Sequence, residues 1–248
     1  MIGLRTVLAT LALAATIVTA QAETVYKVGS TPTGTPFTFL DPQTNTIRGM
    51  MVDVIEEIGK DAGFKVEIQP MAFSALIAAL TAGKIDIISA AMTGSAERAK
   101  VVDFSKDAYS YGEGLIVSAN DKTDYVGAAD LKGKKVGAQI GTRYLDYLKT
   151  QSGASEVVSY DSLPDILRDV GNGRIDAGVG DYPILGYNLA QGRFPQVRLV
   201  KTYQPAMVGP INIAVQKGNA ELLAKIDASL EKMKKDGRFD AILKKWGL

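Results

Sequence analysis

Strand-like and helix-like segments alternate along this chain, and this alternation limits the possible folds more than any other feature. Apolar, β-branched runs over residues 25–30, 64–69 and 85–90 have the length of short strands. Between them, apolar residues recur at helical spacing over 51–58 and 73–80. Strands that alternate with helices predict an α/β fold with mainly parallel sheets flanked by helices.

The same order of segments recurs in the second half of the chain. Strand-like runs cover 134–139 and 157–160, and helical ones cover 142–149 and 163–170. The sequence Gly-Lys-Ile-Asp at 83–86 also has a counterpart 90 positions later, Gly-Arg-Ile-Asp. Each copy follows a predicted helix and precedes an apolar strand. We therefore expect two similar lobes.

Two further strand-like runs, 114–118 and 211–216, would carry the chain into and out of the second lobe. After them, two amphipathic helices over 222–233 and 239–246 should close the first lobe. The predicted division is a signal peptide at 1–22, a first lobe at 23–115 plus 209–248, and a second lobe at 116–208. A lobe inserted in this way implies a two-strand hinge, and ligands of open α/β sheets bind beyond the carboxyl ends of the strands.

The first residues are typical of a secretory signal peptide. Arg5 precedes an uncharged apolar run over 6–19, and Ala20-Gln21-Ala22 is a small-x-small cleavage site. A transmembrane anchor needs about 20 apolar residues, which is more than this run provides. We expect the mature protein to be secreted and soluble in the periplasm.

The composition excludes several functions. The 28 Lys and Arg residues nearly balance 27 Asp and Glu residues, so nucleic acid is not an expected partner. The chain has no cysteine and no histidine, which removes disulfides, the commonest general base and the commonest metal ligand. Phosphate-loop, dinucleotide and nucleophile-elbow patterns are also missing from the sequence. We expect no catalytic residue, no metal and no cofactor.

The strongest candidate for a binding residue is Arg98. The apolar strand at 87–90 continues into Thr93 and Ser95, two residue types that cap helices, and Arg98 falls in the first turn that follows. The helix dipole disfavours a cation there, so a guanidinium at this place suits bidentate binding of a carboxylate. From spacing alone, a solvated helix arginine is the more common explanation.

Two other strand-to-helix junctions offer polar groups. Asp181 ends the predicted strand at 175–180 and is able to bind an ammonium group, although Asp is also a routine helix N-cap. Gly141 and Thr142 offer backbone N–H groups and a hydroxyl before the helix at 142–149. The alternative there is again an ordinary capped helix.

Many short motifs, in the same order along the chain, resemble those of one family, the polar-amino-acid substrate-binding proteins of ABC transporters (extracellular solute-binding family 3). The matches run along essentially the whole mature chain. They are Thr35-Pro36-Phe37, Gly49 with Asp53, residues 79–86, Glu97-Arg98, residues 102–105 and 130–137, Gly141-Thr142, residues 173–177, Asp181 and Lys245-Trp246-Gly247.

The resemblance implies a two-lobed periplasmic-binding-protein (Venus-flytrap) fold that closes around a ligand. By analogy with the family, Arg98 binds an α-carboxylate, Asp181 an α-ammonium group, and Phe73 packs on the ligand side chain. Further expected contacts come from Ala91, Thr93, Gly141 and Thr142. The implied partners are a small amino-acid-like solute and an inner-membrane ABC permease, and the implied state is a monomer. A dehydratase-like enzyme on the same fold and a ligand-sensing module remain alternatives.

Three positions depart from the family pattern. Thr31 and Gly34 stand where many relatives have an acid and an aromatic residue, which opens space or leaves one ligand face to Tyr109 or Tyr111. Arg143 stands where a small residue is common. A cation at 143 favours an acidic ligand side chain or a second carboxylate, unless it points to solvent.

Overall fold

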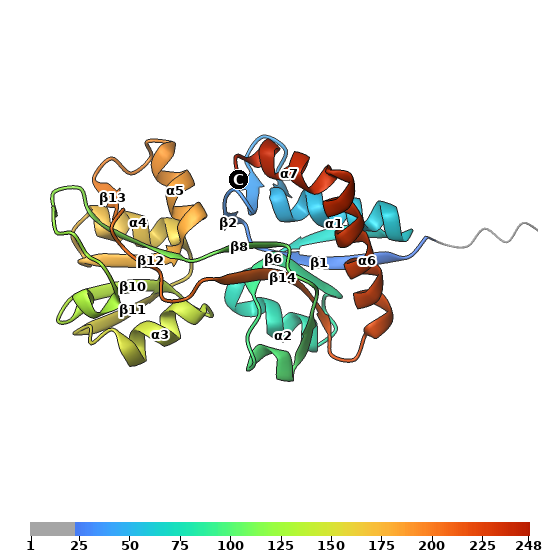
Figure 1. The fold of residues 1–248 in the computed structure, drawn as a ribbon, viewed down its shortest axis with the longest axis horizontal. Helices are drawn as coiled ribbons and strands as arrows, with labels where there is room; N and C mark the ends of the chain where they lie inside the picture. The colour runs from blue at the N-terminus through green and yellow to red at the C-terminus, as the bar shows by residue number, and fades with distance from the viewer. Residues whose placement is uncertain (1–22) are drawn as a thin grey trace, which may run out of the picture.

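Two β-sheets, each flanked by helices, form two lobes (Figure 1). The computed structural model describes residues 23–248, so the predicted signal peptide at 1–22 lies outside the described residues. The first sheet has the spatial order β5 (Lys65–Pro70), β1 (Val25–Ser30), β6 (Ile87–Thr93), β14 (Gly209–Gln216) and β7 (Val102–Phe104), with β8 (Tyr109–Tyr111) also paired to β14. The second has the order β11 (Glu156–Tyr160), β10 (Lys135–Gln139), β12 (Ala177–Asp181), β9 (Glu113–Ser118) and β13 (Val197–Leu199).

Helices cover both sheets. The first lobe carries α1 (Met50–Ala62), α2 (Leu76–Thr81), α6 (Ala220–Asp236) and α7 (Arg238–Trp246), and the second carries α3 (Arg143–Gln151), α4 (Leu163–Gly171) and α5 (Tyr182–Ala190). A small sheet of β2 (Thr33–Gly34), β3 (Thr38–Asp41) and β4 (Thr46–Arg48) adjoins α1. No helix within residues 23–248 is long and apolar enough to cross a membrane.

The predicted α/β fold with mainly parallel sheets is confirmed. In the first sheet β1 pairs in parallel with β5 and β6, and in the second β10 pairs in parallel with β11 and β12. One strand in each described sheet runs against its neighbours, β14 in the first and β9 in the second. These are the strands that adjoin the connections between the lobes. β9 begins where the chain enters the second lobe, and β14 begins where it returns to the first, so each antiparallel strand lies next to a crossing between the lobes.

The repeated Ile-Asp motif has the same structural role in both lobes. Asp86 accepts the backbone N–H of Lys27 through Oδ2 at 2.8 Å, and its own N–H donates to the Lys27 carbonyl at 2.8 Å. Asp176 forms the same pair with Lys135, at 2.7 and 2.8 Å. Asp86 therefore fixes the segment before β6 against β1, and Asp176 fixes the segment before β12 against β10, which explains the 90-residue repeat.

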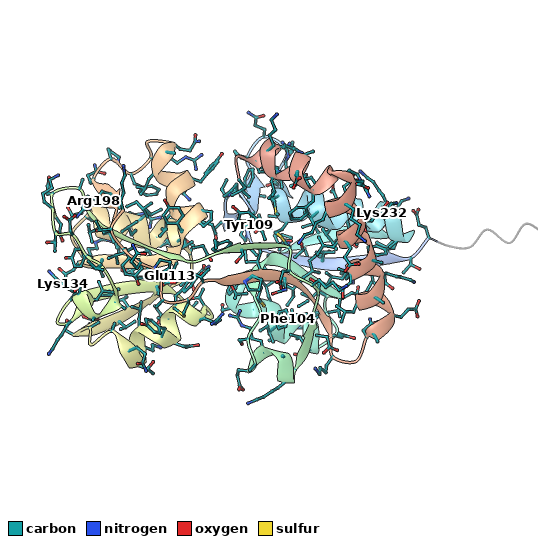
Figure 2. All side chains as sticks on the ribbon, in the orientation of Figure 1. Phe104, Tyr109, Glu113, Lys134, Arg198 and Lys232 are labelled. Atoms are coloured by element: carbon teal, nitrogen blue, oxygen red, sulfur yellow. The ribbon has the colours of Figure 1, made fainter. Side chains whose placement is uncertain are left out.

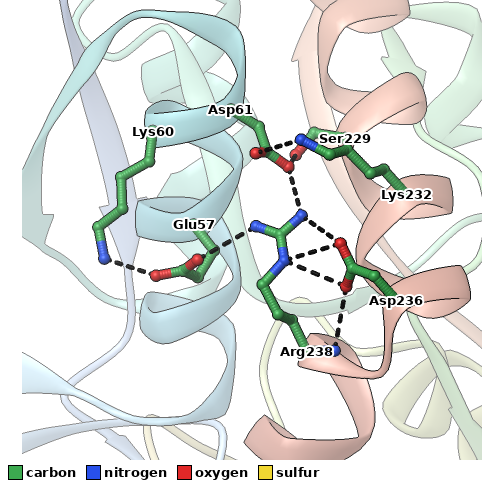
Figure 3. A network of polar contacts seen from close by, with 7 residues as sticks. All are labelled: Glu57, Lys60, Asp61, Ser229, Lys232, Asp236 and Arg238. Atoms are coloured by element: carbon green, nitrogen blue, oxygen red, sulfur yellow. Dashed lines mark hydrogen bonds and ion pairs between the residues drawn. The ribbon is translucent and has the colours of Figure 1, made fainter.

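An ion-pair network ties the C-terminal helices to the first lobe (Figure 3). Arg238 donates to Asp61 of α1 at 2.7 Å, and Lys232 of α6 donates to the same carboxylate at 2.9 Å. Ser229 adds a third hydrogen bond at 3.1 Å. The hydrogen bonds from Arg238 and then Lys232 hold the pKa of Asp61 well below its usual range. These contacts keep α6 and α7 against α1. The two C-terminal helices therefore complete the first lobe.

A buried glutamate joins the two chain segments that cross between the lobes. Glu113 is the first residue of β9, where the outgoing segment enters the second sheet (Figure 2). Its carboxylate accepts the backbone N–H groups of Ala206 at 2.6 Å and Met207 at 3.0 Å, and the Tyr203 hydroxyl at 3.2 Å. All three donors lie on the returning segment. The two crossings are thus held together side by side, as a two-strand hinge requires.

Candidate functional site

A pocket lies between the two lobes, at the carboxyl ends of β6 and β12. The first lobe contributes Phe73, Thr93 and Arg98 to its wall, and the second contributes Arg143 and Asp181. Ala91 and Thr142 line it as well, so seven of the eight predicted site residues surround one pocket. The eighth, Gly141, contributes its carbonyl oxygen through a contact with Arg98. The carboxyl ends of the parallel strands of both sheets therefore meet at one place, as the strand order predicts.

Arg98 is directed into this pocket and is not a solvated helix arginine. It begins a short 3-10 turn, η2 (Arg98–Lys100), and is partly buried. Its guanidinium donates to the Thr93 carbonyl at 2.5 Å and to the Gly141 carbonyl of the other lobe at 2.7 Å. The guanidinium carbon also lies 5.8 Å from the ring centre of Phe73. Burial, and then the charge of Arg143, lower the pKa of Arg98, although a guanidinium stays protonated at any ordinary pH.

Asp181 precedes α5, but its carboxylate does not cap that helix. It accepts a hydrogen bond from the Tyr144 hydroxyl at 3.0 Å instead. Burial raises the pKa of Asp181, and hydrogen bonds from Tyr111 and Tyr144 oppose that rise. A cation entering the pocket would therefore find a carboxylate that has lost part of its hydration and gains from a positive partner.

At the junction of Gly141 and Thr142, the Thr142 side chain is a helix cap. Thr142 accepts the Leu145 N–H at 3.3 Å and donates to the Gln139 carbonyl at 2.6 Å, so its hydroxyl is already committed to the start of α3. Gly141 adopts φ +79°, and a Cβ there would lie 2.9 Å from the Cα of Ser74 in the first lobe. Glycine at 141 thus permits the close approach of the two lobes beside the pocket.

Arg143 faces the first lobe across the pocket. It is the first residue of α3, is partly buried, and its guanidinium donates to the Gly94 carbonyl at 3.5 Å. The direction of this side chain answers the question that the sequence left open, because it lines the pocket and does not point to bulk solvent.

The end of β6 carries an irregularity at the pocket wall. The pairing of β6 with β14 shifts register between Asn212 and Ala214, and Ala91 adopts φ +53°. Such bulges re-aim the end of a strand, and a non-glycine residue in this conformation is held there by its surroundings. Thr93 lies two residues after Ala91, and Asn212 accepts the Gly94 N–H at 3.4 Å. The bulge therefore sets the position of the segment that leads to Arg98.

Tyr109 and Tyr111, the predicted substitutes for the missing aromatic residue, lie behind the pocket wall. Tyr109 and Tyr111 pack on Phe37, with ring centres 6.1 and 5.3 Å away, and they are not among the pocket-lining residues. The space beside Gly34 is taken by Ile184 of the other lobe, whose Cδ1 would lie 3.5 Å from a Cβ at Gly34. Because Ile184 comes from a distant part of the chain, no local sequence signal pointed to it.

The sequence also did not single out Tyr144, although it follows Thr142 by two residues. Tyr144 lines the pocket and orients Asp181. Burial, followed by the charge of Asp181, raises the pKa of its hydroxyl far above the ordinary value, so Tyr144 remains a hydrogen-bond donor at any physiological pH.

The polar groups of the pocket suit an organic ion with charges of both signs. Arg98 and Arg143 supply positive charge, and Asp181 is the one acid among the lining residues. Within residues 23–248, no group of three or more His, Cys, Asp or Glu side chains is placed to hold a metal ion. The arrangement can hold a carboxylate on one side and an ammonium group on the other.

Comparison with known proteins assigns the family. Residues 26–248 match the model of the bacterial extracellular solute-binding proteins, family 3, and the chain belongs to that family. It is similar to the ABC transporter glutamine-binding protein GlnH of Bacillus subtilis (strain 168), with 33% identity over 85% of this chain and 76% of the relative. It is 30% identical to the L-cystine-binding protein TcyJ of Escherichia coli (strain K12), over 88% of this chain and 81% of the relative.

A solved structure shares the fold closely. An ancestral arginine-binding protein bound to arginine superposes with a TM-score of 0.83 at 36% identity, covering 91% of this chain and 99% of that one. This likeness confirms the predicted two-lobed binding-protein fold.

Proposed function

We propose that this chain captures an amino acid or an amino-acid-like solute between its lobes for an ABC importer, and does not change it chemically. One observation carries the proposal: Arg98 of the first lobe and Asp181 of the second line the same pocket. An α-amino acid bears a carboxylate and an ammonium group on one carbon, so it is able to join these two side chains. Lobe closure would remove both charge pairs from water and strengthen them.

Seven of the eight predicted site residues have a place in this proposal. Arg98 would exchange its hydrogen bond to the Gly141 carbonyl for the ligand carboxylate, and Asp181 would bind the ammonium group. Thr93, Ala91, Gly141 and Thr142 would contribute backbone groups and the Thr93 hydroxyl, and Phe73 would pack on the aliphatic part. The lobes would be residues 23–115 plus 209–248 and residues 116–208, with closure at the segments that Glu113 joins.

Binding without catalysis is supported by the relatives reported above, all of which are named as binding proteins. The proposed setting is the periplasm, with the loaded monomer passing its ligand to an inner-membrane permease.

A ligand screen tests the proposal. Purified mature protein is heated with single amino acids and related carboxylates, because a ligand that binds the folded state raises the Tm by an amount set by RT ln(1 + [L]/Kd). We expect a clear increase with at least one zwitterionic amino acid. Mass spectrometry of the recovered ligand should show it unchanged, whereas a dehydrated or otherwise altered product would favour the enzyme alternative. A folded protein that no amino acid stabilises would contradict the proposal.

A further inference from the structure

The charged side chains around the pocket do not balance. Two guanidinium groups, those of Arg98 and Arg143, line it together with a single carboxylate, that of Asp181. The hydrogen bonds of both guanidinium groups go to backbone carbonyl oxygens, at Thr93, Gly141 and Gly94. The pocket wall therefore carries one more positive than negative side chain.

The two arginines cross the pocket in opposite directions. Arg98 reaches from the first lobe to the Gly141 carbonyl at 2.7 Å, and Arg143 reaches from the second lobe to the Gly94 carbonyl at 3.5 Å. After burial, the charge of Arg143 is the largest influence that lowers the pKa of Arg98, so the two charges act on each other. Two like charges on facing walls favour an anionic ligand between them.

Helix stability does not account for Arg143. It is the first residue of α3, where the helix dipole disfavours a cation. Its hydrogen bond to Gly94 is long, and a guanidinium offers five N–H donors in a fork that matches a carboxylate. The arginine thus has both the charge and the free donor geometry to bind a second anionic group.

We propose that Arg143 selects solutes that carry a second carboxylate, so the preferred ligands of this pocket are acidic amino acids. This inference rests on the proposed function. A neutral amino acid pairs with Arg98 and Asp181 and brings no second carboxylate to Arg143. A cationic amino acid adds repulsion from Arg143, which disfavours it further. A second carboxylate matches three ligand charges to three side-chain charges.

Matched acid and amide ligands test this inference. Isothermal titration compares L-aspartate with L-asparagine and L-glutamate with L-glutamine, and L-2-aminoadipate and L-2-aminopimelate extend the reach of the second carboxylate. At least one acid should bind about fivefold more tightly than the amides, the upper ratio expected from one partly exposed charge pair. Added salt should reduce the difference. L-Arginine should bind more weakly than L-glutamine.

The variant Arg143→Gln should lower the ratio of acid to amide affinity to about one. Lys149→Gln, an exposed change on the same helix, serves as the matched control and should keep the preference. If acids and amides bind equally well to the native protein, or if Arg143→Gln weakens both to the same extent, the inference is wrong and the proposed function stands. If no acid or amide binds the folded native protein, the inference is wrong, and the wider ligand screen described above decides the proposed function.

Discussion

The guanidinium of Arg98 donates to the carbonyl oxygen of Gly141 at 2.7 Å, across the pocket and from a position 43 residues earlier in the chain. The side chain proposed to bind the ligand carboxylate is therefore also a contact between the lobes. Because Gly141 lies at the start of α3, the same hydrogen bond connects the end of β6 in one lobe to a helix of the other. If Arg98 binds the ligand as proposed, this residue would link ligand binding to the contact between the lobes.

Replacing Arg98 with glutamine should abolish most ligand binding. The variant leaves the ligand carboxylate unpaired in a closed pocket, which should weaken binding by about 2–5 kcal/mol. Isothermal titration measures the change in Kd. Arg174→Gln is the control, since Arg174 forms an exposed ion pair with Asp169 away from the pocket, and its Kd should equal the native value. An Arg98→Gln variant with native affinity would show that the carboxylate binds elsewhere.

Binding of an amino acid with a neutral side chain should weaken as the pH falls. Burial raises the pKa of Asp181 in the unliganded protein, and only its charged form pairs with an ammonium group. Affinity is therefore full above that raised pKa and is lost as the pH drops through it. Kd measured from about pH 8 to about pH 4 at constant ionic strength checks this. Asp181→Asn should bind more weakly and lose this dependence; a variant that kept the native pH profile would assign the titration to another group.

Glu113→Gln should destabilise the protein through the hinge. Glu113 is 2% exposed and accepts two backbone N–H groups from the returning segment. The amide NH2 of glutamine cannot accept one of them, and a buried donor without an acceptor costs about 1–3 kcal/mol. At about 2–4 °C per kcal/mol for a chain of this size, thermal unfolding should show a clear drop in Tm. Glu97→Gln, which removes an exposed ion pair with Lys100, should change Tm little; equal Tm values for the two variants would rule out this role.

The two lobes should respond alike to a methyl group added at equivalent glycines. A Cβ at Gly29 would lie 2.5 Å from Cδ1 of Ile85, and one at Gly137 would lie 2.7 Å from Cδ1 of Ile175. Overpacking of this kind should lower the free energy of unfolding by about 1–3 kcal/mol in Gly29→Ala and Gly137→Ala. Urea denaturation measures it.

Second-site variants test the cause of that loss. Ile85→Val removes the clashing Cδ1 and should restore part of the stability of Gly29→Ala. Recovery in the other lobe through Ile175→Val should be smaller. The added methyl group at Gly137 also meets the rigid Tyr160 ring at 2.7 Å, whereas the second contact at Gly29 is with the flexible Cδ2 of Leu76 at 2.9 Å. Gly186→Ala, in α5 with no atom near the added Cβ, should be neutral or stabilising by about 0.5–1 kcal/mol. No recovery in either double variant would contradict the packing explanation.

The sequence by itself determined the order of strands and helices and the existence of two similar lobes. Apolar periodicity reports which face of a segment is buried, and that property is local. The repeated Asp86 and Asp176 likewise sit beside the segments that they fix. Residue types at strand ends also drew attention to Arg98 and Asp181, because free N–H groups and caps gather where strands lead into helices.

Only the tertiary structure decided what those side chains face. Aspartate and threonine serve equally as helix caps and as ligand-binding groups, and the contacts alone separate the cases: Thr142 caps α3, whereas Asp181 leaves α5 uncapped and accepts from Tyr144. Arg143 spans the pocket and Ile184 fills the space beside Gly34 because segments far apart in the chain are brought together when the lobes pack. Side-chain direction across a cleft depends on that packing, and local sequence patterns carry no record of it.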